Sequence, residues 1–303
     1  MQSGITRYIA RRAVLAVLLV LLASSAAFVL TRLAPGDYFS DPQFDPAFVA
    51  AERARLGLDR PLLEQYGDWL AAGLLLDFGE SLRFRRPVSA LIRERAGNTV
   101  LLGVTALVAA TAMGIPIGVV TGTRRRGVVA AVARSASIVL LSIPPLVTSL
   151  ALLLIASRTG WFPIGGGHVL LPALALALPV AAVLERLQSQ AIAETLNEPA
   201  VLAAIARGIP PDRVIWRHCL RLSLKPVLAI YGVIVGSVLS GSFVVEIVMA
   251  WPGLGGLMYD ALLSRDLYLV AGCAAVGSVF LALGILLSDL ALLALDPRLR
   301  ETP

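Results

Sequence analysis

Residues 198–226 read EPAVLAAIARGIPPDRVIWRHCLRLSLKP and form the longest polar interruption in the second half of an otherwise apolar chain. Asn197 precedes this stretch and can cap a helix whose first turn holds Glu198 and Pro199, where an acid and a proline are both tolerated. Small and apolar residues follow as far as Gly208. This glycine is placed to end the helix, because glycine adopts the left-handed conformation at little cost.

A second short helix is expected after the bend that Pro210 and Pro211 impose. It carries the positive charge of the stretch, at Arg213, Arg217, His218 and Arg221. Pro226 then marks the start of the next apolar run. The pattern predicts helix, bend and helix between two membrane spans. The small-residue first helix offers a surface that another protein can approach closely, and an ordinary basic cytoplasmic loop is the alternative.

The composition indicates a polytopic membrane protein. Of 303 residues 57% are hydrophobic and 15% are charged, whereas a soluble domain is nearer a quarter charged. A net charge of +6 fits cytoplasmic loops beside anionic lipid, so nucleic acid need not be invoked. Cys219 and Cys273 form no CxxC pair, and His168 and His218 lie far apart, so the sequence suggests neither a disulfide framework nor a metal site.

Six apolar runs are long enough to span a bilayer, and arginines in the short loops place both termini in the cytoplasm. The runs are Ile9–Leu30, Thr99–Thr121, Ser135–Ser157, Val169–Leu184, Val227–Val248 and Leu269–Leu295. Prolines 144, 145, 172 and 179 are expected to bend the third and fourth spans. A cleaved signal peptide is the alternative for the first run, but Phe28–Leu30 continues it beyond the small residues Ala23–Ala27, which favours an uncleaved span.

The fold expected is therefore an all-α integral membrane protein with an extracytoplasmic domain after its first span. We divide the chain into residues 1–31 (tail and first span), 32–98 (extracytoplasmic domain), 99–296 (five-helix core with a cytoplasmic loop at 185–226) and 297–303 (cytoplasmic tail). Glu246, near the outer end of the fifth span, is expected to be hydrated, and Asp289 is read as an isolated acid. A tight outer turn is expected at Trp251–Gly256.

No catalytic constellation is evident in the sequence. Lys225, the only lysine, follows Leu224, so there is no Gly-Lys-Ser/Thr phosphate loop, and no HExxH motif occurs. No Gly-x-Ser lies on a span. We therefore expect no catalytic residues, no metal and no cofactor in this chain, which is not an enzyme by itself. A pore without its own energy source must run downhill, use a gradient or borrow an ATPase.

Several phrases, in order and spacing, resemble the permease subunits of ABC-type importers for dipeptides, oligopeptides, nickel and opines. These phrases are Arg7–Arg12, Arg32–Asp37, Leu56–Pro61, Asp77–Ser81, Gly114–Gly118, Trp251–Gly255 and Leu295–Arg298. The resemblance covers nearly the whole chain. It implies a bacterial or archaeal inner-membrane pore subunit that works with a second homologous permease, two cytoplasmic ATPases that hold ATP and Mg²⁺, and an extracytoplasmic binding protein.

The quoted stretch is similar to the cytoplasmic coupling loop of that family. The resemblance implies an ATPase-docking helix carried by Leu202, Ala203, Ala204, Arg207, Gly208 and Pro226. The physical basis is a helix lying in a groove, where small residues permit close approach. Leu202, Ile205 and Pro210 depart from the residues common in the family, and the segment between Trp161 and Leu171 is shorter than usual.

An outer gate or binding-protein contact is expected at Glu246, Trp251, Pro252, Gly253 and Gly255. The alternative function is a six-helix secondary transporter or channel that works alone. It predicts an ionisable pair at the membrane midplane and paired broken helices, and the prolines at 144, 145 and 179 are compatible with such breaks. A membrane-bound enzyme lacks any candidate constellation.

Overall fold

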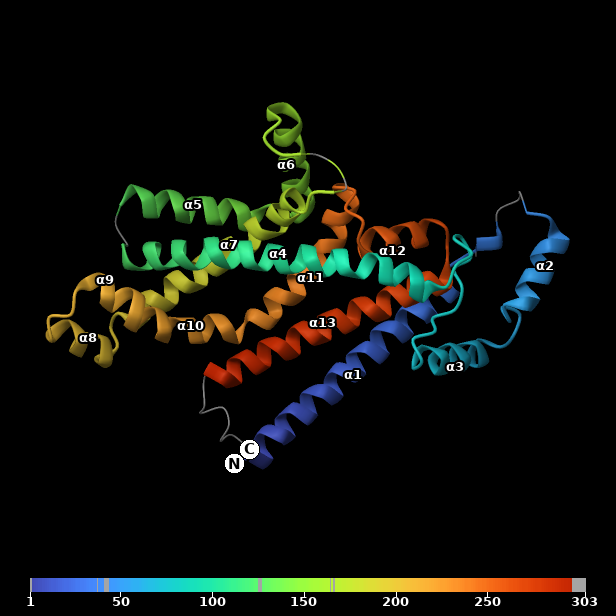
Figure 1. Ribbon diagram of the computed structural model, residues 1–303, viewed down its shortest axis with the longest axis horizontal. Helices are drawn as coiled ribbons and strands as arrows, with labels where there is room; N and C mark the ends of the chain where they lie inside the picture. Colours follow the sequence, from blue (N-terminus) through green and yellow to red (C-terminus); the bar gives the residue numbers. More distant parts are fainter. Residues whose placement is uncertain are drawn as a thin grey trace. The chain divides into compact units, whose positions relative to one another are not determined.

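The computed structural model describes residues 2–36, 38–40, 44–124, 127–163, 165 and 167–295, and the predicted tail at 297–303 lies outside them. Helices dominate the described residues (Figure 1), and the one β-bridge joins Glu80 to Pro87. The longer helices are α1 (Gln2–Leu33), α2 (Pro46–Arg55), α3 (Leu62–Gly73), α4 (Val88–Thr123), α5 (Val128–Ser142), α6 (Pro145–Thr159), α7 (Leu170–Thr195), α8 (Pro199–Ala206), α10 (Leu220–Ala229), α11 (Tyr231–Val248), α12 (Leu254–Leu263) and α13 (Leu267–Leu295). Short turns complete the set: η1 (Tyr38–Ser40), α9 (Pro211–Arg213) and the π-helical η2 (Val214–Cys219).

The chain forms two compact units. The first unit comprises Met1–Ala13, Val100–Trp251 and Leu283–Pro303, and the second comprises Val14–Thr99 and Pro252–Ala282. Each unit is therefore assembled from segments that are distant in the sequence. The predicted division at residues 31, 98 and 296 stays a prediction.

In the first unit, α7 is the central helix. Both α5 and α10 pack along it (Figure 1), and α6 and α11 also contact it. Alanines make up much of its buried surface, including Ala173, Ala175, Ala177 and Ala181. Because alanine side chains are short, neighbouring helices can lie close to α7, and packing rather than hydrophobic transfer holds helices together in lipid.

In the second unit, the region between α1 and α4 is ordered by polar contacts to α13. Asp266 is fully buried just before α13, where its carboxylate accepts hydrogen bonds from Ser81 Oγ (2.6 Å) and from the backbone N–H of Arg83 (3.1 Å). It also accepts from the backbone N–H of Leu269. Burial raises the pKa of Asp266, although these hydrogen bonds act in the opposite direction.

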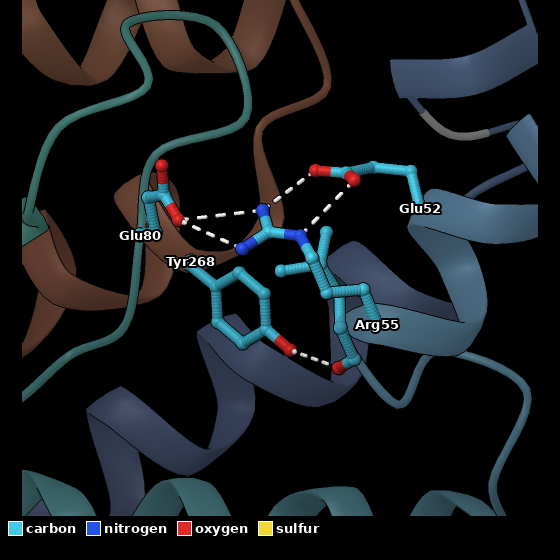
Figure 2. A network of polar contacts seen from close by, with 5 residues as sticks. Glu52, Arg55, Glu80 and Tyr268 are labelled. Atoms are coloured by element: carbon cyan, nitrogen blue, oxygen red, sulfur yellow. Dashed lines mark hydrogen bonds and ion pairs between the residues drawn. The ribbon is translucent and has the colours of Figure 1, made fainter. Parts of the chain in front are cut away.

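A second tie in this unit centres on Arg55 at the end of α2. Figure 2 shows its guanidinium between the carboxylates of Glu52 and Glu80, which accept at 2.6 Å and 3.4 Å. Nearby, the hydroxyl of Tyr268 donates to the carbonyl oxygen of Leu56. The hydrogen bond from Arg55 lowers the pKa of Glu52. The charges are exposed, so the ion pairs themselves add little stability and mainly orient the loop that carries Glu80.

By length and composition, the described residues contain five helices able to cross a membrane, or six if one sharply bent pair is a single span. The bent pair is α5 and α6, which meet at 113°. The third predicted span, Ser135–Ser157, is therefore interrupted at Pro144 and Pro145, as expected, and its two halves count as one span only when they are taken together. Ile143 leaves the helical conformation, as a residue before proline tends to do, and Pro145 opens the next helix.

Three other predicted boundaries differ from the structure. Helix α4 begins at Val88, eleven residues before Thr99, and α7 continues past Leu184 to Thr195. The predicted fifth span also begins too early, because α10 ends at Ala229 and α11 starts at Tyr231. Hydropathy predicts which residues can face lipid. A helix can extend beyond those residues wherever its polar side chains are covered by other parts of the protein.

Candidate coupling site

The predicted docking helix is present as α8, and its C-terminus is closed by glycine. Gly208 has φ +76°, its N–H donates to Ile205, and the N–H of Ile209 donates to Ala204. These two bonds form a Schellman motif, which satisfies carbonyls that the helix end would leave without partners. The prediction for Gly208 is confirmed. The predicted cap at Asn197 is wrong, because Glu198 occupies the N-cap position without a side-chain bond and the Asn197 amide donates to Ala193.

The two faces of α8 differ sharply in exposure. Leu202 and Ile205 are each 51% exposed, and Ala203 and Arg207 are also exposed. Ala204 is only 7% exposed. The expectation that both alanines face a partner is therefore corrected: Ala203 lies on the outer face, whereas Ala204 packs inward and holds the helix in place.

The inner face of α8 rests on a buried apolar cluster. Val201 and Ala204 pack there with Val119 of α4, Ile192 of α7, and Val214 and Cys219 of η2. Three segments that are separate in sequence thus converge beneath one two-turn helix. Such a short helix is marginal by itself, so this packing is what fixes its position.

The second helix of the stretch is longer than predicted. It opens at Pro211 as expected, passes through the π-helical turn η2 and continues to Ala229. Pro226 lies inside α10 rather than at the start of an apolar run, and it is exposed. Figure 1 shows α8 and α9 at the end of α7 and α10. The predicted docking helix is therefore carried by two of the helices that form the first unit.

A ladder of glycines brings α4 against α7 just before α7 leads into α8. Gly114, Gly118 and Gly122 are spaced by four residues and so lie on one face of α4. A methyl group added at Gly118 would lie 2.6 Å from Gln188 Cβ and 2.7 Å from the carbonyl oxygen of Glu185. The corresponding closest approaches at Gly114 and Gly122 are 2.6 Å and 2.5 Å. The two backbones touch, as in small-residue packing of membrane helices.

Two polar pairs accompany this contact, and both were missed in the sequence. Thr121 Oγ1 donates to Glu185 Oε1 at 2.5 Å, and Gln188 Nε2 donates to Ser223 Oγ of α10 at 2.7 Å. All four side chains are buried. The spacing of four residues between successive glycines is a signal in the sequence for close helix packing. Nothing in the sequence pairs Thr121 with Glu185, because 64 residues separate them.

A cavity of about 590 Å³ opens beside these pairs, between α4, α5 and α7. Its lining is mixed, with Ser137, Ser189 and Gln190 beside Ile138 and Leu141, and charged Arg134, Arg186, Glu185 and Glu194.

The predicted outer-gate residues are mostly buried. Glu246 is 1% exposed, so the expectation that it is hydrated is wrong. Trp251 is buried in the first unit, and its backbone N–H donates to the carbonyl oxygen of Glu246 (2.9 Å) at the end of α11. The turn predicted at Trp251–Gly256 lies earlier in the chain, because α11 ends at Val248 and α12 already begins at Leu254. Gly253 and Gly255 are buried at the start of α12, and Pro252 is partly buried. These side chains are placed to pack the turn rather than to present a contact surface.

Asp289 is not isolated, which corrects a further expectation. Its Oδ2 lies 3.2 Å from Nε of Arg12, and both residues belong to the first unit. The pair joins α1 to α13 near their ends.

Comparison with known proteins agrees with this architecture. The description "Binding-protein-dependent transport system inner membrane component" matches residues 114–301, and its N-terminal counterpart matches residues 5–103. The chain belongs to this family of inner-membrane components. It is a permease subunit of an ABC importer and a multi-pass bacterial membrane protein. The alternative of a transporter working alone is not supported.

Among curated relatives, the chain is 33% identical to the oligopeptide transport system permease protein AppB of Bacillus subtilis, over 96% of this chain and 98% of that protein. It is 31% identical to the dipeptide transport system permease protein DppB of the same species, over 97% and 98%. It is also 31% identical to the glutathione transport system permease protein GsiC of Salmonella choleraesuis, over 97% and 98%.

Proposed function

We propose that this chain forms half of a pore that imports peptides, and that α8 couples the pore to a cytoplasmic ATPase. A second homologous permease supplies the other half, and two ATPase subunits bind ATP and Mg²⁺ and hydrolyse ATP. An extracytoplasmic binding protein delivers the peptide. The names of the relatives, which transport oligopeptides, dipeptides or glutathione, support a peptide substrate.

The observation that carries the proposal is the outer face of α8. Leu202 and Ile205 expose half of their surfaces on a helix whose opposite face is fixed by packing. An exposed apolar face on a positioned helix is what a hydrophobic groove recognises. Ala203 lies on the same side and permits close approach. Arg207 follows at the end of the helix, where it can pair with an acid of the partner.

The contacts beneath α8 supply the transmission. Because α4 and α7 touch backbone to backbone at Gly118, a displacement of α8 moves packed helices rather than a loose loop. The cavity lined by Glu185 lies against the same helices. ATP binding draws the two coupling helices together, and the spans change which side of the membrane the cavity faces.

This mechanism requires both termini and α8 to be cytoplasmic. The arginines of the short loops support that orientation under the positive-inside rule. Residues 32–98 then lie outside, where they and the exposed side of α12, with Tyr259, Leu262 and Leu263, receive the binding protein.

The test compares one substitution at two adjacent positions. The importer is purified from membranes of its source through a tag on this chain, and ATP hydrolysis and co-purifying ATPase are measured. Ala203→Arg adds a long charged side chain to the exposed face. It is expected to abolish ATPase co-purification and transport without changing the thermal stability of the chain. The matched variant, Ala204→Arg, places the same side chain in the buried cluster and is expected to lower thermal stability.

Two results would overturn the proposal. If Ala203→Arg retained normal co-purification, hydrolysis and uptake, α8 would not be the docking element. If no ATPase accompanied the unaltered chain while uptake persisted, coupling to a partner ATPase would be wrong altogether. Peptide uptake is measured with a labelled dipeptide, tripeptide and pentapeptide, and failure to transport all three would exclude the substrate class while leaving the coupling test intact.

A further inference from the structure

Helix α3 presents three distinct faces. Gln65 and Trp69 are buried, whereas Glu64 and Asp68 are exposed and bond to the guanidinium of Arg60 at 3.2 Å and 2.6 Å. The third face is apolar and exposed, and it continues into the residues that follow the helix. We call it the leucine face: Leu63, Leu74, Leu75 and Leu76, which are 70% to 84% exposed.

The helix geometry makes this face continuous. Leu63, Gly67, Ala71 and Leu74 fall within about 80° of one another at 3.6 residues per turn. Gly67 and Ala71 are exposed as well, and a methyl group added at Gly67 would meet nothing within 4 Å. A strongly exposed apolar strip of this kind marks an interaction surface when other residues of the same helix are charged.

The buried face of α3 fixes the helix against the end of α1, within the second unit. Phe28 of α1 lies 5.1 Å from the Trp69 ring and 5.9 Å from the Tyr66 ring, measured between centroids. The hydroxyls of Ser25 and Tyr66 are 2.7 Å apart. Arg32 donates to the side chain of Gln65. Figure 1 shows α3 beside this end of α1.

The sequence of α1 sets the depth of these contacts in the membrane. No charged residue occurs between Arg12 and Arg32. At 1.5 Å per residue this interval is about 30 Å long, which equals the thickness of the hydrocarbon core. Arg32 therefore marks one boundary of that core, and α3, bonded to it, lies at the headgroup level. The partly exposed Tyr66 agrees with this depth, because tyrosine side chains concentrate at membrane interfaces.

We propose that α3 is an interfacial helix whose leucine face is covered by lipid, so that it anchors the region between α1 and α4 to the membrane surface. Continuity with α1 favours lipid as the occupant: Leu22, Leu30 and Leu33 are also exposed on the stretch of α1 that carries α3. The charged face with Glu64 and Asp68 then meets water. An amphipathic helix in this position buries its apolar face roughly 5–10 Å into the headgroup region.

The experiment uses the assembled importer in lipid vesicles. Single cysteines replace Leu63 or Leu74 on the leucine face, and Glu64 or Asp68 on the charged face of the same helix. Each is labelled with a polarity-sensitive fluorophore. The native Cys219 and Cys273 are buried, and the unsubstituted protein gives their background. Quenching is compared between nitroxide-bearing lipids and aqueous iodide.

Labels at Leu63 and Leu74 are expected to lose roughly half or more of their emission to lipid nitroxides and little to iodide. Labels at Glu64 and Asp68 are expected to show the reverse. Equal iodide quenching on both faces would overturn the proposal. So would protection of Leu63 and Leu74 from both quenchers in the assembly but not in the isolated subunit, because a protein partner would then cover the face.

Discussion

Replacing Gly118 by alanine tests whether the backbone contact between α4 and α7 holds this protein together. The added methyl group would lie 2.6 Å from Gln188 Cβ, about 0.8 Å inside the 3.4 Å at which ordinary contact begins. Its other near neighbour is the carbonyl oxygen of Glu185, a backbone atom that cannot rotate away. The helices must therefore separate, or α7 must shift along α4.

The expected cost follows from overpacking of a tight interface. Inserting a methyl group into a well-packed region costs about 1–3 kcal/mol. Alanine recovers up to about 1 kcal/mol because it favours the helix over glycine. The net loss is therefore roughly 0–2 kcal/mol, which corresponds to a fall in Tm of at most roughly 4–8 °C. Against a control that shares the gain in helix propensity, the full cost of about 1–3 kcal/mol is expected.

The assay is thermal unfolding of the purified assembly in detergent, with Gly103→Ala as the matched control. Gly103 lies on the same helix and shares the same gain in propensity, but its added methyl group would meet nothing closer than 3.9 Å. Gly103→Ala should leave the Tm unchanged or raise it. If Gly118→Ala were as stable as Gly103→Ala, the close approach of the two backbones would be refuted.

Three further predictions follow from other contacts. Gly208→Val should destabilise the end of α8 by about 1–2 kcal/mol, because φ at this position is +76°. The variant should also reduce ATP hydrolysis by the purified importer. Unchanged hydrolysis and an unchanged Tm would contradict the need for glycine at this position. Burial raises the pKa of Asp266, so its protonated form is favoured by folding and stability should fall as pH rises from the ordinary aspartate pKa through the raised one. Asp266→Asn should reduce the dependence of Tm on pH, because asparagine does not titrate in this range. The variant should also have a lower Tm, because the substitution weakens the hydrogen bond to Ser81. If Tm depended on pH as strongly in the variant as in the original protein, Asp266 would be excluded as the source of that dependence. Thr121→Val removes the donor to the buried Glu185 carboxylate and should cost about 1–3 kcal/mol. A double-mutant cycle with Glu185→Leu, which removes the acceptor, should give a coupling energy, and its absence would show that the bond contributes nothing.

Much of the fold follows from local sequence signals. Apolar runs locate the membrane helices because the bilayer demands about 20 apolar residues and internally satisfied backbone. Proline and glycine residues indicate where helices are interrupted, because their steric effects on the backbone depend only on residues nearby in the sequence. Gly208 ends α8 and Pro211 opens the following helix, as expected. The order of short phrases along the chain was sufficient to indicate the family.

Hydropathy alone did not predict where the helices begin and end. Helix α7 continues through Glu185 and Gln188, which look like the beginning of a loop in the sequence. Thr121 donates to Glu185 and Ser223 accepts from the amide nitrogen of Gln188, and both partners come from other helices. The start of α4 at Val88 was missed for a related reason, since Arg93, Glu94 and Arg95 interrupt the apolar pattern without breaking the helix.

The sequence by itself determined the class of protein, the number of apolar runs and the position of helix α8, because these depend on composition and on residues close together in the chain. Only the tertiary structure decided which face of that helix is available. Ala203 and Ala204 are chemically identical, and burial of one of them depends on Val119, Ile192 and Val214, which lie 10 to 85 residues away and reach the helix only through folding.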